Sequence, residues 1–342
     1  MEPVTHALTS LLLAQAGQKH LPRFGGAMIV VSGVAADLDY FSYLGGASAF
    51  LRFHRTVLHS LLGSVILAAA LAAAFCFLDR TRRTKASVSA LPALTFLPAF
   101  AVCVVGAAAH DLLDLASGIG VRLFWPFREG WIAGDLLTDL DLWILIILLL
   151  GIALPELFRL VGEEIGERKK KTRGQGAAVI ALLSLLIYVG ARAELHSRAM
   201  DLLNSREYHG QPPLTVAAFP TGYSPFRWRA VISTDNAIDD AEISLAPGAH
   251  FDPDRAVPHY KPQDSAALDA AQKTATAKRF LAYARFPLAS SEPSDNGYKV
   301  RIRDMRFAPN DASPNNIVAV VNLDLNQKVI EETLFYASSL NR

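Results

Sequence analysis

The chain has 342 residues, of which 51% are hydrophobic, and its 33 basic and 32 acidic residues leave a formal net charge of +1. This near-neutral balance excludes the strongly basic field that nucleic-acid-binding proteins present to phosphates. The two cysteines, Cys76 and Cys103, both lie within apolar runs. Their position argues against a disulfide or a thiolate metal site and favours small core side chains.

The composition changes near residue 195, and this change divides the chain into two predicted domains. Residues 1–195 are dominated by Ala, Leu, Val, Ile and Gly, whereas residues 196–342 are polar and rich in Pro, Asp, Asn and Arg. We predict an α-helical multi-span membrane bundle for 1–195 and a soluble, mainly β extramembrane domain for 196–342. The first residues, Met1-Glu2-Pro3, lack the basic start of a signal peptide, so we expect them to be retained.

About six membrane spans are predicted, because a spanning helix needs roughly 20 mostly apolar residues. Three runs meet this criterion clearly, and a fourth begins with two aspartates before the run LWILIILLLGIALP. The first two segments are weaker and rich in Gly and Ala, so we expect them to be short, re-entrant or tightly packed. In chain order the six segments are 4–18, 24–44, 57–78, 91–113, 139–158 and 174–194.

The basic loops predict the orientation of the bundle, because such loops face the cytoplasm in inner membrane proteins. Lysines and arginines cluster at 19–23, 80–85 and 168–173, in the loops after the first, third and fifth spans. These loops lie on one side, which we expect to be cytoplasmic, so that the N-terminus and the C-terminal domain are extracytoplasmic. The protein is therefore expected to be a multi-pass protein of the cell (inner) membrane.

With this topology, the ionisable residues of the spans gather at the extracytoplasmic end. Charged groups inside a bilayer are costly, usually face a bundle interior and mark function. A proton or ion pathway would need polar residues through the full depth, and the third and fourth spans have none in their inner halves. The gathered residues are His6, Asp37, Asp39, His54, His59, His110, Asp114, Asp135, Asp139 and Asp141.

Two short motifs carry the strongest local signal. In HDLLD, His110 and Asp114 are four positions apart, so both side chains lie on one face of a helix, one turn apart. In ADLD, Asp37 and Asp39 are two residues apart and would diverge on a regular α-helix. We therefore expect a helix end or a distorted turn at ADLD.

A third motif, FHRTVLHSLLGS, places His54, Arg55 and His59 at the edge of a run that has no charged residue from Ser60 to Leu78. The two histidines converge best with His54 in a loop and His59 in the first helical turn. The arginine could bind a phosphate or stabilise developing charge. Alternatively, it only anchors the span at the lipid headgroups.

Imidazole nitrogens and carboxylate oxygens together are typical ligands of divalent transition metals. A single catalytic zinc takes about three protein ligands, and this set offers seven. We therefore predict two divalent ions that activate water, with Zn as the first choice and Mn or Fe as alternatives. The predicted catalytic residues are Asp39, Arg55 and Asp114, and the predicted ligands are His6, Asp37, Asp39, His54, His59, His110 and Asp114.

Less specific interpretations stay open for these residues. A single histidine or aspartate in a span can serve as a hydrogen bond between helices. Asp135 and Asp139 can be N-caps or first-turn acids of the helix that follows. For the whole set, an ion-coupled transporter would use the same acids, and a non-enzymatic membrane protein would use a metal to hold its spans together.

Four motifs follow one another in a combination that is more specific than any single one: THALTS (5–10), ADLDYF (36–41), FHRTVLHSLLGS (53–64) and GAAAHDLLDLASGIGVRLFWPF (106–127). This combination resembles the YdjM-like family of membrane-bound metal-dependent hydrolases. The resemblance implies a multi-span helical fold, a hydrolase activity and the seven ligands named above, in a pattern similar to the zinc-dependent phospholipase C type of site. Ala36 stands where the family commonly has Pro, which keeps both acids but alters the turn.

Several β-rich segments separated by Pro, Asn, Asp and Gly turns predict a small, mainly antiparallel sheet in the C-terminal domain. An Ala-rich helix is expected around 265–280. The stretch PTGYSPFRW is expected to form a loop over the site with Trp228 and Arg229 as substrate contacts, or else to begin a strand with a core Trp. The predicted strands lie within 227–234, 241–246, 279–289, 298–307, 316–326 and 329–336.

These features favour an integral membrane metal-dependent hydrolase. In it, a metal-activated water attacks a phosphoester or lipid-like substrate at the outer membrane face. The expected partners are the lipid bilayer and an amphiphilic or small-molecule substrate, and no nucleic acid. The site lies at headgroup depth, which suits a bond that a lipid presents.

Overall fold

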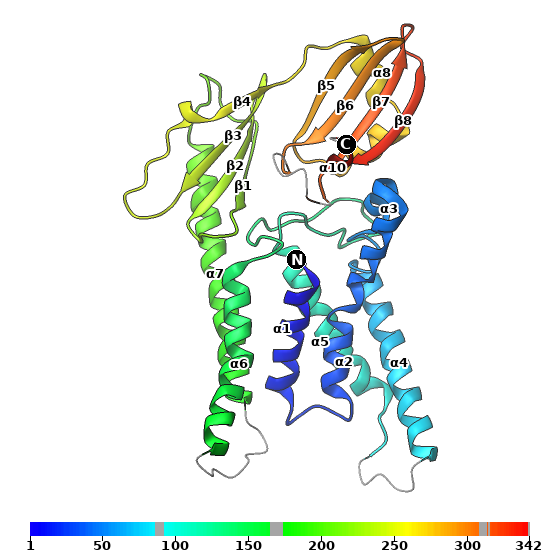
Figure 1. Ribbon diagram of the computed structural model, residues 1–342, viewed down its shortest axis with the longest axis vertical. Coiled ribbons are helices and arrows are strands. Elements are labelled where there is room, and N and C mark those ends of the chain that lie inside the picture. The colour runs from blue at the N-terminus through cyan, green and yellow to red at the C-terminus, as the bar shows by residue number, and fades with distance from the viewer. Residues whose placement is uncertain (86–91, 165–173, 308–312, 314, 341–342) are drawn as a thin grey trace. The chain divides into compact units, whose positions relative to one another are not determined.

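The computed structural model describes residues 1–85, 92–164, 174–307, 313 and 315–340 (Figure 1). Contacts between residues divide the chain into two compact units. The first, which we call the membrane unit, contains residues 1–39 and 55–194, and the second, the C-terminal unit, contains residues 40–54 and 195–342. The short segment 40–54 thus packs with the C-terminal unit although it interrupts the membrane unit in sequence.

Every segment that the sequence predicts to span contains a helix. In chain order these are α1 (Pro3–Gly17), α2 (Gly25–Ser32), α4 (Leu61–Lys85), α5 (Phe96–Leu115), α6 (Leu142–Glu164) and α7 (Gln175–Asn204).

Six full spans are not confirmed, because only four of the described helical runs are long and apolar enough to cross a membrane. The 15 residues of α1 are fewer than a span needs, and among the described residues α6 contributes a shorter apolar helix, Leu142–Phe158. The four runs are Gly25–Phe53, Leu61–Arg83, Phe96–Leu115 and Gln175–Asn204.

Helix α5 is central in the membrane unit and packs against α1, α2 and α4, while α1 also contacts α6. The close approach of α2 and α5 depends on Gly106, since a Cβ atom there would meet the Ser32 side chain and lie 2.5 Å from the Ile29 carbonyl oxygen. Small residues at helix contacts are typical of membrane bundles because they let backbones approach. This contact brings the end of α2 beside the face of α5 that carries His110.

The ADLD motif lies in η1 (Ala35–Gly45), a 3₁₀-helix that follows α2 directly. The predicted distortion is therefore confirmed, since a 3₁₀-helix is a tighter winding than the α-helix. The expectation for His59 is wrong, because α4 begins at Leu61 and His59 lies in the irregular segment before it. His54 is the C-cap of α3 (Gly46–Phe53), outside regular helix as expected.

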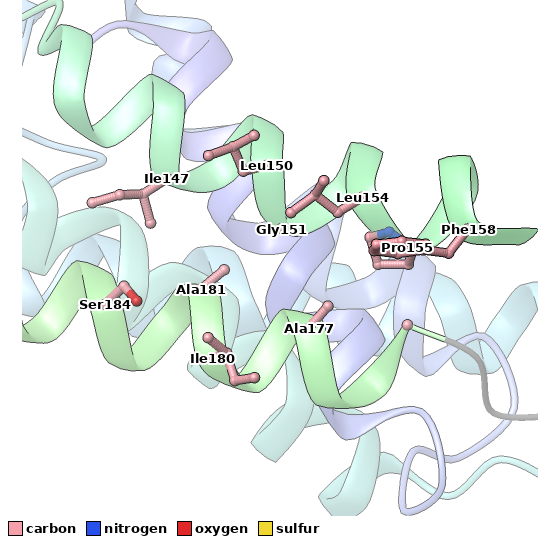
Figure 2. A pocket seen from close by; sticks show the side chains of 11 residues that line it. Ile147, Leu150, Gly151, Leu154, Pro155, Phe158, Ala177, Ile180, Ala181 and Ser184 are labelled. Atoms are coloured by element: carbon pink, nitrogen blue, oxygen red, sulfur yellow. The ribbon is translucent and has the colours of Figure 1, made fainter.

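A groove of about 540 Å³ lies between α6 and α7 in the membrane unit (Figure 2). Its lining is apolar except for Ser184 and includes Leu154, Phe158 and Ile180. Where the two helices touch, a Cβ atom on Gly151 would lie 2.5 Å from that of Ala181, so this glycine permits the close contact. None of the residues that line the groove carries a metal-ligating side chain. The candidate functional site is therefore in another part of the membrane unit.

The C-terminal unit contains two four-stranded antiparallel sheets with strand orders β1-β2-β3-β4 and β5-β6-β7-β8, whereas the sequence predicts one sheet. Two short helices, α8 (Ala266–Gln272) and α9 (Ala275–Leu281), replace the predicted Ala-rich helix. The strands are β1 (Thr215–Pro220), β2 (Arg227–Ser233), β3 (Ala237–Ser244), β4 (Val257–Tyr260), β5 (Pro287–Ser294), β6 (Gly297–Asp304), β7 (Ile317–Asp324) and β8 (Val329–Tyr336).

One predicted strand, 279–289, begins too early, because residues 279–281 end α9 and β5 begins only at Pro287. The side chain of Thr274 accepts a hydrogen bond from the Ala277 N–H. This N-cap stabilises α9. The helix therefore includes the Arg-Phe-Leu stretch that the sequence predicts as the beginning of a strand.

Trp228 and Arg229 have structural roles in the C-terminal unit. Trp228 is fully buried and packs with Leu203, Tyr208 and Ile232. Arg229 makes a bidentate ion pair with Asp240 and donates to the carbonyl oxygens of Met305 and Arg306. The alternative of a strand that begins with a core Trp is therefore the one the structure supports.

Candidate metal centre

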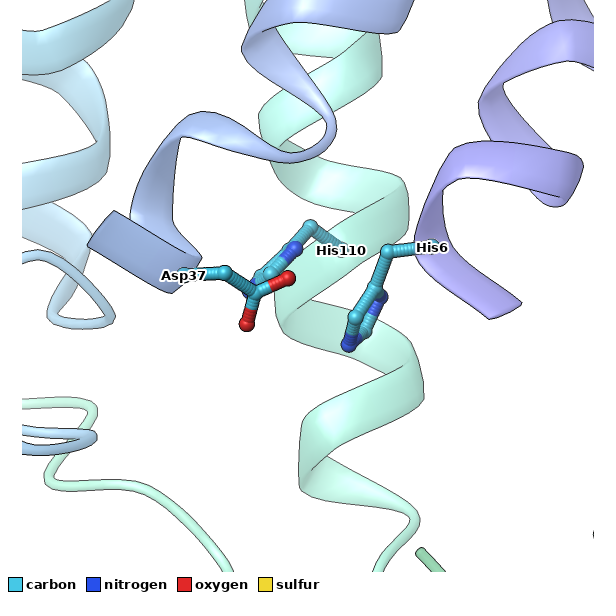
Figure 3. Close-up of side chains that lie close together, drawn as sticks. All are labelled: His6, Asp37 and His110. Carbon is cyan, nitrogen blue, oxygen red and sulfur yellow. The ribbon is translucent and has the colours of Figure 1, made fainter. Parts of the chain in front are cut away.

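Four segments of the membrane unit supply the buried polar side chains. His6 comes from α1, Asp37 and Asp39 from η1, His59 from the segment before α4, and His110 and Asp114 from α5. Figure 3 shows His6, Asp37 and His110 with their side chains turned toward one another. The i, i+4 spacing on α5 places His110 and Asp114 on one face as predicted, with Nε2 and Oδ2 3.5 Å apart.

The tightest group joins His59, His110 and Asp114. The Nε2 atoms of the two histidines lie 3.0 Å apart, and the Oδ2 atom of Asp114 lies 3.1 Å from His59 Nε2. All three residues are at most 1% exposed. Two imidazole nitrogens and one carboxylate oxygen therefore converge in a space closed to water.

Second contacts orient both imidazole rings. The Nδ1 atom of His110 lies 2.9 Å from the carbonyl oxygen of Gly33, which can only accept, so Nδ1 carries the proton. The Nδ1 atom of His59 lies 3.0 Å from Asp39 Oδ2, a carboxylate that likewise favours a proton on Nδ1. The two Nε2 atoms then face each other beside Asp114 Oδ2, where a proton or a bound cation can bridge them.

A second group joins His6, Asp37 and His110 and shares His110 with the first. The rings of His6 and His110 are stacked with centroids 3.8 Å apart, and His6 Nε2 lies 3.3 Å from Asp114 Oδ1. Neither ring nitrogen of His6 has a hydrogen bond, nor does Asp37 Oδ2, although all three atoms are buried. Buried polar atoms are normally satisfied, so this group has unused ligand capacity.

Arg55 compensates the acids from inside the protein. It is 1% exposed, and its guanidinium lies 3.3 Å from Asp114 Oδ1 and 3.5 Å from Asp139 Oδ1. It also donates to Ser117 Oγ at 2.8 Å, and its backbone N–H donates to Asp39 Oδ2 at 2.7 Å. These contacts hold the guanidinium against the protein's own carboxylates. They do not favour the predicted role in which Arg55 binds a substrate phosphate.

Asp114 has a further positive neighbour in the α-amino group of Met1, which bonds its Oδ1 atom. The two oxygens of Asp114 therefore have different surroundings. The Oδ1 atom faces Arg55, His6 and the amino group, whereas Oδ2 faces His59 and His110. Oδ2 is thus the oxygen of this carboxylate that lies with the paired imidazoles.

The remaining predicted residues lie outside both groups. Asp39 faces His59 Nδ1 and the Arg55 backbone N–H, so it supports a ligand. His54 belongs to the C-terminal unit, where its ring stacks on Phe50 at 4.3 Å between centroids and lies 4.5 Å from Tyr40. Of the acids before α6, Asp141 caps that helix by accepting from the N–H groups of Trp143 and Ile144, and Asp139 pairs with Arg55.

Two participants were missed in the sequence. Asp111, inside the HDLLD motif, is 6% exposed and accepts a hydrogen bond from Ser64 Oγ at 2.6 Å. A charged residue in an apolar helix was the available signal, but its offset from His110 placed it on another helix face. Gly33 participates through its backbone carbonyl, which no side-chain pattern reveals.

The donor set fits a divalent transition metal. Two neutral imidazoles and a carboxylate are the ligands of many catalytic zinc sites, in which the fourth position is open. Each ligating imidazole is held by an outer partner, as is usual for metal-bound histidines. The buried His/Asp groups could therefore hold a metal ion.

The family comparison agrees with the division of the chain. A family model described as YdjM inner membrane protein matches residues 1–196. A second, described as YfhP C-terminal alpha/beta plait domain, matches residues 266–340, which include α8, α9 and β5 to β8. No curated protein and no solved structure matches the chain.

Proposed function

We propose that this chain, which belongs to the YdjM family of inner membrane proteins, is an integral membrane metal-dependent hydrolase. Its substrate would be a phosphoester or a lipid-like molecule with such a bond. The observation that carries the proposal is the pair of His59 and His110 Nε2 atoms, 3.0 Å apart and both beside Asp114 Oδ2. With a proton on each Nδ1, both rings would offer Nε2 to the same point, which is the arrangement that a cation requires.

One divalent ion would be held by His59, His110 and Asp114, with Zn as the best match and Mn or Fe as alternatives. The unused atoms of His6 and Asp37 are the natural ligands of a second ion. When bound, such ions supply Lewis acidity that polarises a substrate oxygen and activates water near neutral pH. The proposal of two ions is supported by the two overlapping groups.

The other residues would act on these ligands. Asp39 and the Gly33 carbonyl hold the imidazole tautomers, and Arg55 offsets the negative charge of Asp114 before a cation binds. Asp111 lies next to His110 in sequence, is buried and has one oxygen without a hydrogen bond. It is a candidate to take up a proton during hydrolysis.

The proposed substrate follows from the surroundings of the centre. Its residues lie on α1 and α5 and directly before α4, and α4 and α5 are apolar enough to cross a membrane, so a substrate with an acyl or prenyl part would meet a compatible environment. The basic clusters at 19–23 and 80–85 support a placement of the centre at the extracytoplasmic face.

The test combines metal analysis with activity in the purified full chain. Wild type should contain bound Zn, Mn or Fe and should cleave a member of a phosphodiester and phospholipid panel. His110→Ala and His59→Ala should lose both metal and activity. His54→Ala is the matched control, because His54 belongs to neither group, and it should keep both. Metal-free wild type that stays metal-free after incubation with Zn, or cleavage that persists in His110→Ala, would contradict the proposal.

A structural metal is the second candidate, and the burial of His59, His110 and Asp114 favours it. A closed site held by ligands from separate helices would stabilise the bundle without chemistry. In that case His110→Ala would lower the thermal stability sharply, and no phosphoester in the panel would be cleaved by metal-loaded wild type.

A further inference from the structure

The segment between α5 and α6 forms a hairpin whose tip is aromatic and exposed. Val121 and Ile132 exchange two backbone hydrogen bonds of 2.9 and 3.0 Å, and Gly120, at φ +76°, lets the two arms approach. Beyond this bridge, Phe127 is 82% exposed and Phe124 is 41% exposed. We call residues 117–137 the aromatic hairpin.

Water is a poor environment for this tip. Its sequence, LFWPFREGWI (123–132), carries two Trp and two Phe, and an exposed cluster of this kind marks a binding surface or a membrane contact. Arg122 stacks over the Trp131 ring at 5.7 Å, and Arg128 is exposed. Aromatic rings together with arginine are typical of the membrane interface, where rings lie at headgroup level and guanidinium groups meet phosphates.

Exposed apolar side chains also lie near the ends of the two helices that the hairpin connects. Leu112 near the end of α5 is 66% exposed, and Leu140 just before α6 is 60% exposed. Trp143 in the first turn of α6 is 43% exposed. Apolar helices of this kind typically face lipid, and the hairpin directly follows α5, which is long and apolar enough to cross a membrane.

The hairpin is also bound to the segment that carries His59. The Arg122 N–H donates to the Arg55 carbonyl at 3.1 Å, and the Leu61 N–H donates to the Leu123 carbonyl at 2.9 Å. These two bonds lie on either side of His59 in sequence. The guanidinium of Arg55 reaches the other end of the hairpin at Ser117. The position of the tip and the position of His59 are therefore linked by backbone hydrogen bonds.

We propose that the tip of the aromatic hairpin inserts into the headgroup layer of the leaflet at the metal-centre end of the bundle. Its partner is the lipid surface itself, and its contacts fix the depth of the His59 segment relative to the lipid headgroups. The insertion does not depend on hydrolysis. The further consequence, that a lipid-like substrate is presented along the hairpin, rests on the proposed function.

The depth of the tip can be measured with a nitroxide spin label. The label is attached to Phe127→Cys in a full-length Cys76→Ala, Cys103→Ala background, reconstituted in phosphatidylethanolamine and phosphatidylglycerol vesicles. Power saturation compares its collisions with oxygen, which is enriched in lipid, and with a water-soluble nickel chelate. Leu186→Cys on α7, 67% exposed, is the lipid reference, and Tyr223→Cys in the C-terminal unit, 88% exposed, is the water reference.

The label at 127 should give an accessibility ratio between the two references, closer to that of the label at 186. A ratio equal to that of Tyr223 would overturn the proposal, as would a strongly immobilised label that neither reagent reaches, which would show that protein covers the tip.

A second variant tests, separately from the insertion, whether the hairpin presents a lipid-like substrate. Phe127 lies outside both metal groups, so the Phe127→Asp protein should keep its bound metal. Its KM for a long-chain phospholipid should be several-fold higher than that of wild type. The same variant should leave a short-chain phosphodiester unaffected. If neither substrate is cleaved by wild type, the proposed function fails while the depth measurement still decides the insertion.

Discussion

Asp39 contacts a residue of the candidate metal centre and belongs to neither group of converging atoms. It contacts His59 Nδ1 and the Arg55 backbone N–H. An acid in this position fixes the tautomer of the ring and raises the basicity of the opposite nitrogen. Its role at the residue scale is to position His59.

Asp39→Asn should therefore weaken metal binding while the fold is kept. The amide cannot act as a proton acceptor of equal strength, so we expect the metal affinity to fall roughly 10- to 100-fold, the range for outer-shell partners of metal ligands. Competition with a fluorescent zinc chelator measures this. Asp141→Asn is the control, since Asn is as good an N-cap as Asp, and it should bind metal as wild type does. Unchanged affinity in Asp39→Asn would contradict the positioning role.

Asp239 in β3 gives a pH dependence outside the membrane helices. Burial raises the pKa of this carboxyl above 3.8, partly offset by His209, whose Nε2 lies 3.1 Å from Oδ1, and by the more distant His259. A raised pKa in the folded state means that stability is lost as the pH rises from the ordinary value through the raised one.

Asp239→Asn should remove this loss, because the amide does not ionise and can still contact His209. Thermal unfolding of the full chain between pH 4 and pH 8, at steps of about one unit, should show that Asp239→Asn gains relative to wild type toward high pH. Asp235→Asn, at an exposed site, should follow wild type across the range. A gain for Asp239→Asn that is largest at low pH would contradict the sign of this argument.

At the scale of elements, the contact of α2 with α5 decides the geometry of the centre. Gly106 permits this contact, and the Gly33 carbonyl at the end of α2 orients His110 on α5. The sequence reveals the i, i+4 pair because helical periodicity is local. It does not reveal Gly33 or Asp39 as orienting groups, because their roles arise only when separate elements meet.

Gly106→Val should force α2 and α5 apart. Overpacking of a tight contact typically costs about 1–3 kcal/mol, and the displaced Gly33 carbonyl should also reduce metal affinity. Thermal stability in detergent and metal content measure both effects. Ala108→Val, on an exposed face of the same helix, should leave both unchanged, and equal behaviour of the two variants would sink this explanation.

At the scale of the whole molecule, the segment 40–54 belongs to the C-terminal unit, whereas the residues before and after it in sequence belong to the membrane unit. It packs in the C-terminal unit, where Tyr43 stacks on Tyr336 at 4.6 Å between centroids, yet Asp39 and Arg55 flank it in the membrane unit. The division near residue 195 is visible in the sequence, because the composition changes there. The placement of His54 could not be predicted, since it depends on contacts of α3 with the distant strand β8.

Two sheets also escaped prediction for a physical reason. Alternating patterns identify single strands, but which strands pair is set by long-range packing, here of Ala217, Val231 and Ile238 against Phe286 and Met305. Trp228 is buried in a separate cluster, with Leu203 and Tyr208, on the opposite face of the first sheet.

Tyr336→Ala should loosen the segment 40–54. Hydrogen–deuterium exchange of the reconstituted full chain should show faster exchange in peptides that cover 40–54, because the stacked ring and the Tyr336 hydroxyl bond to the Tyr43 carbonyl are lost. Tyr260→Ala, at a site 71% exposed, should leave that exchange unchanged. Equal protection in both variants would contradict the packing role of Tyr336.

The central claim is that His59, His110 and Asp114 hold a divalent ion. X-ray absorption spectroscopy of zinc-loaded protein tests it most directly. The account predicts imidazole scattering from at least two histidines, with Zn–N distances of about 2.0–2.1 Å, that disappears in the His59→Ala, His110→Ala double variant. A zinc environment of oxygen ligands alone, or one that the double substitution leaves unchanged, would contradict it.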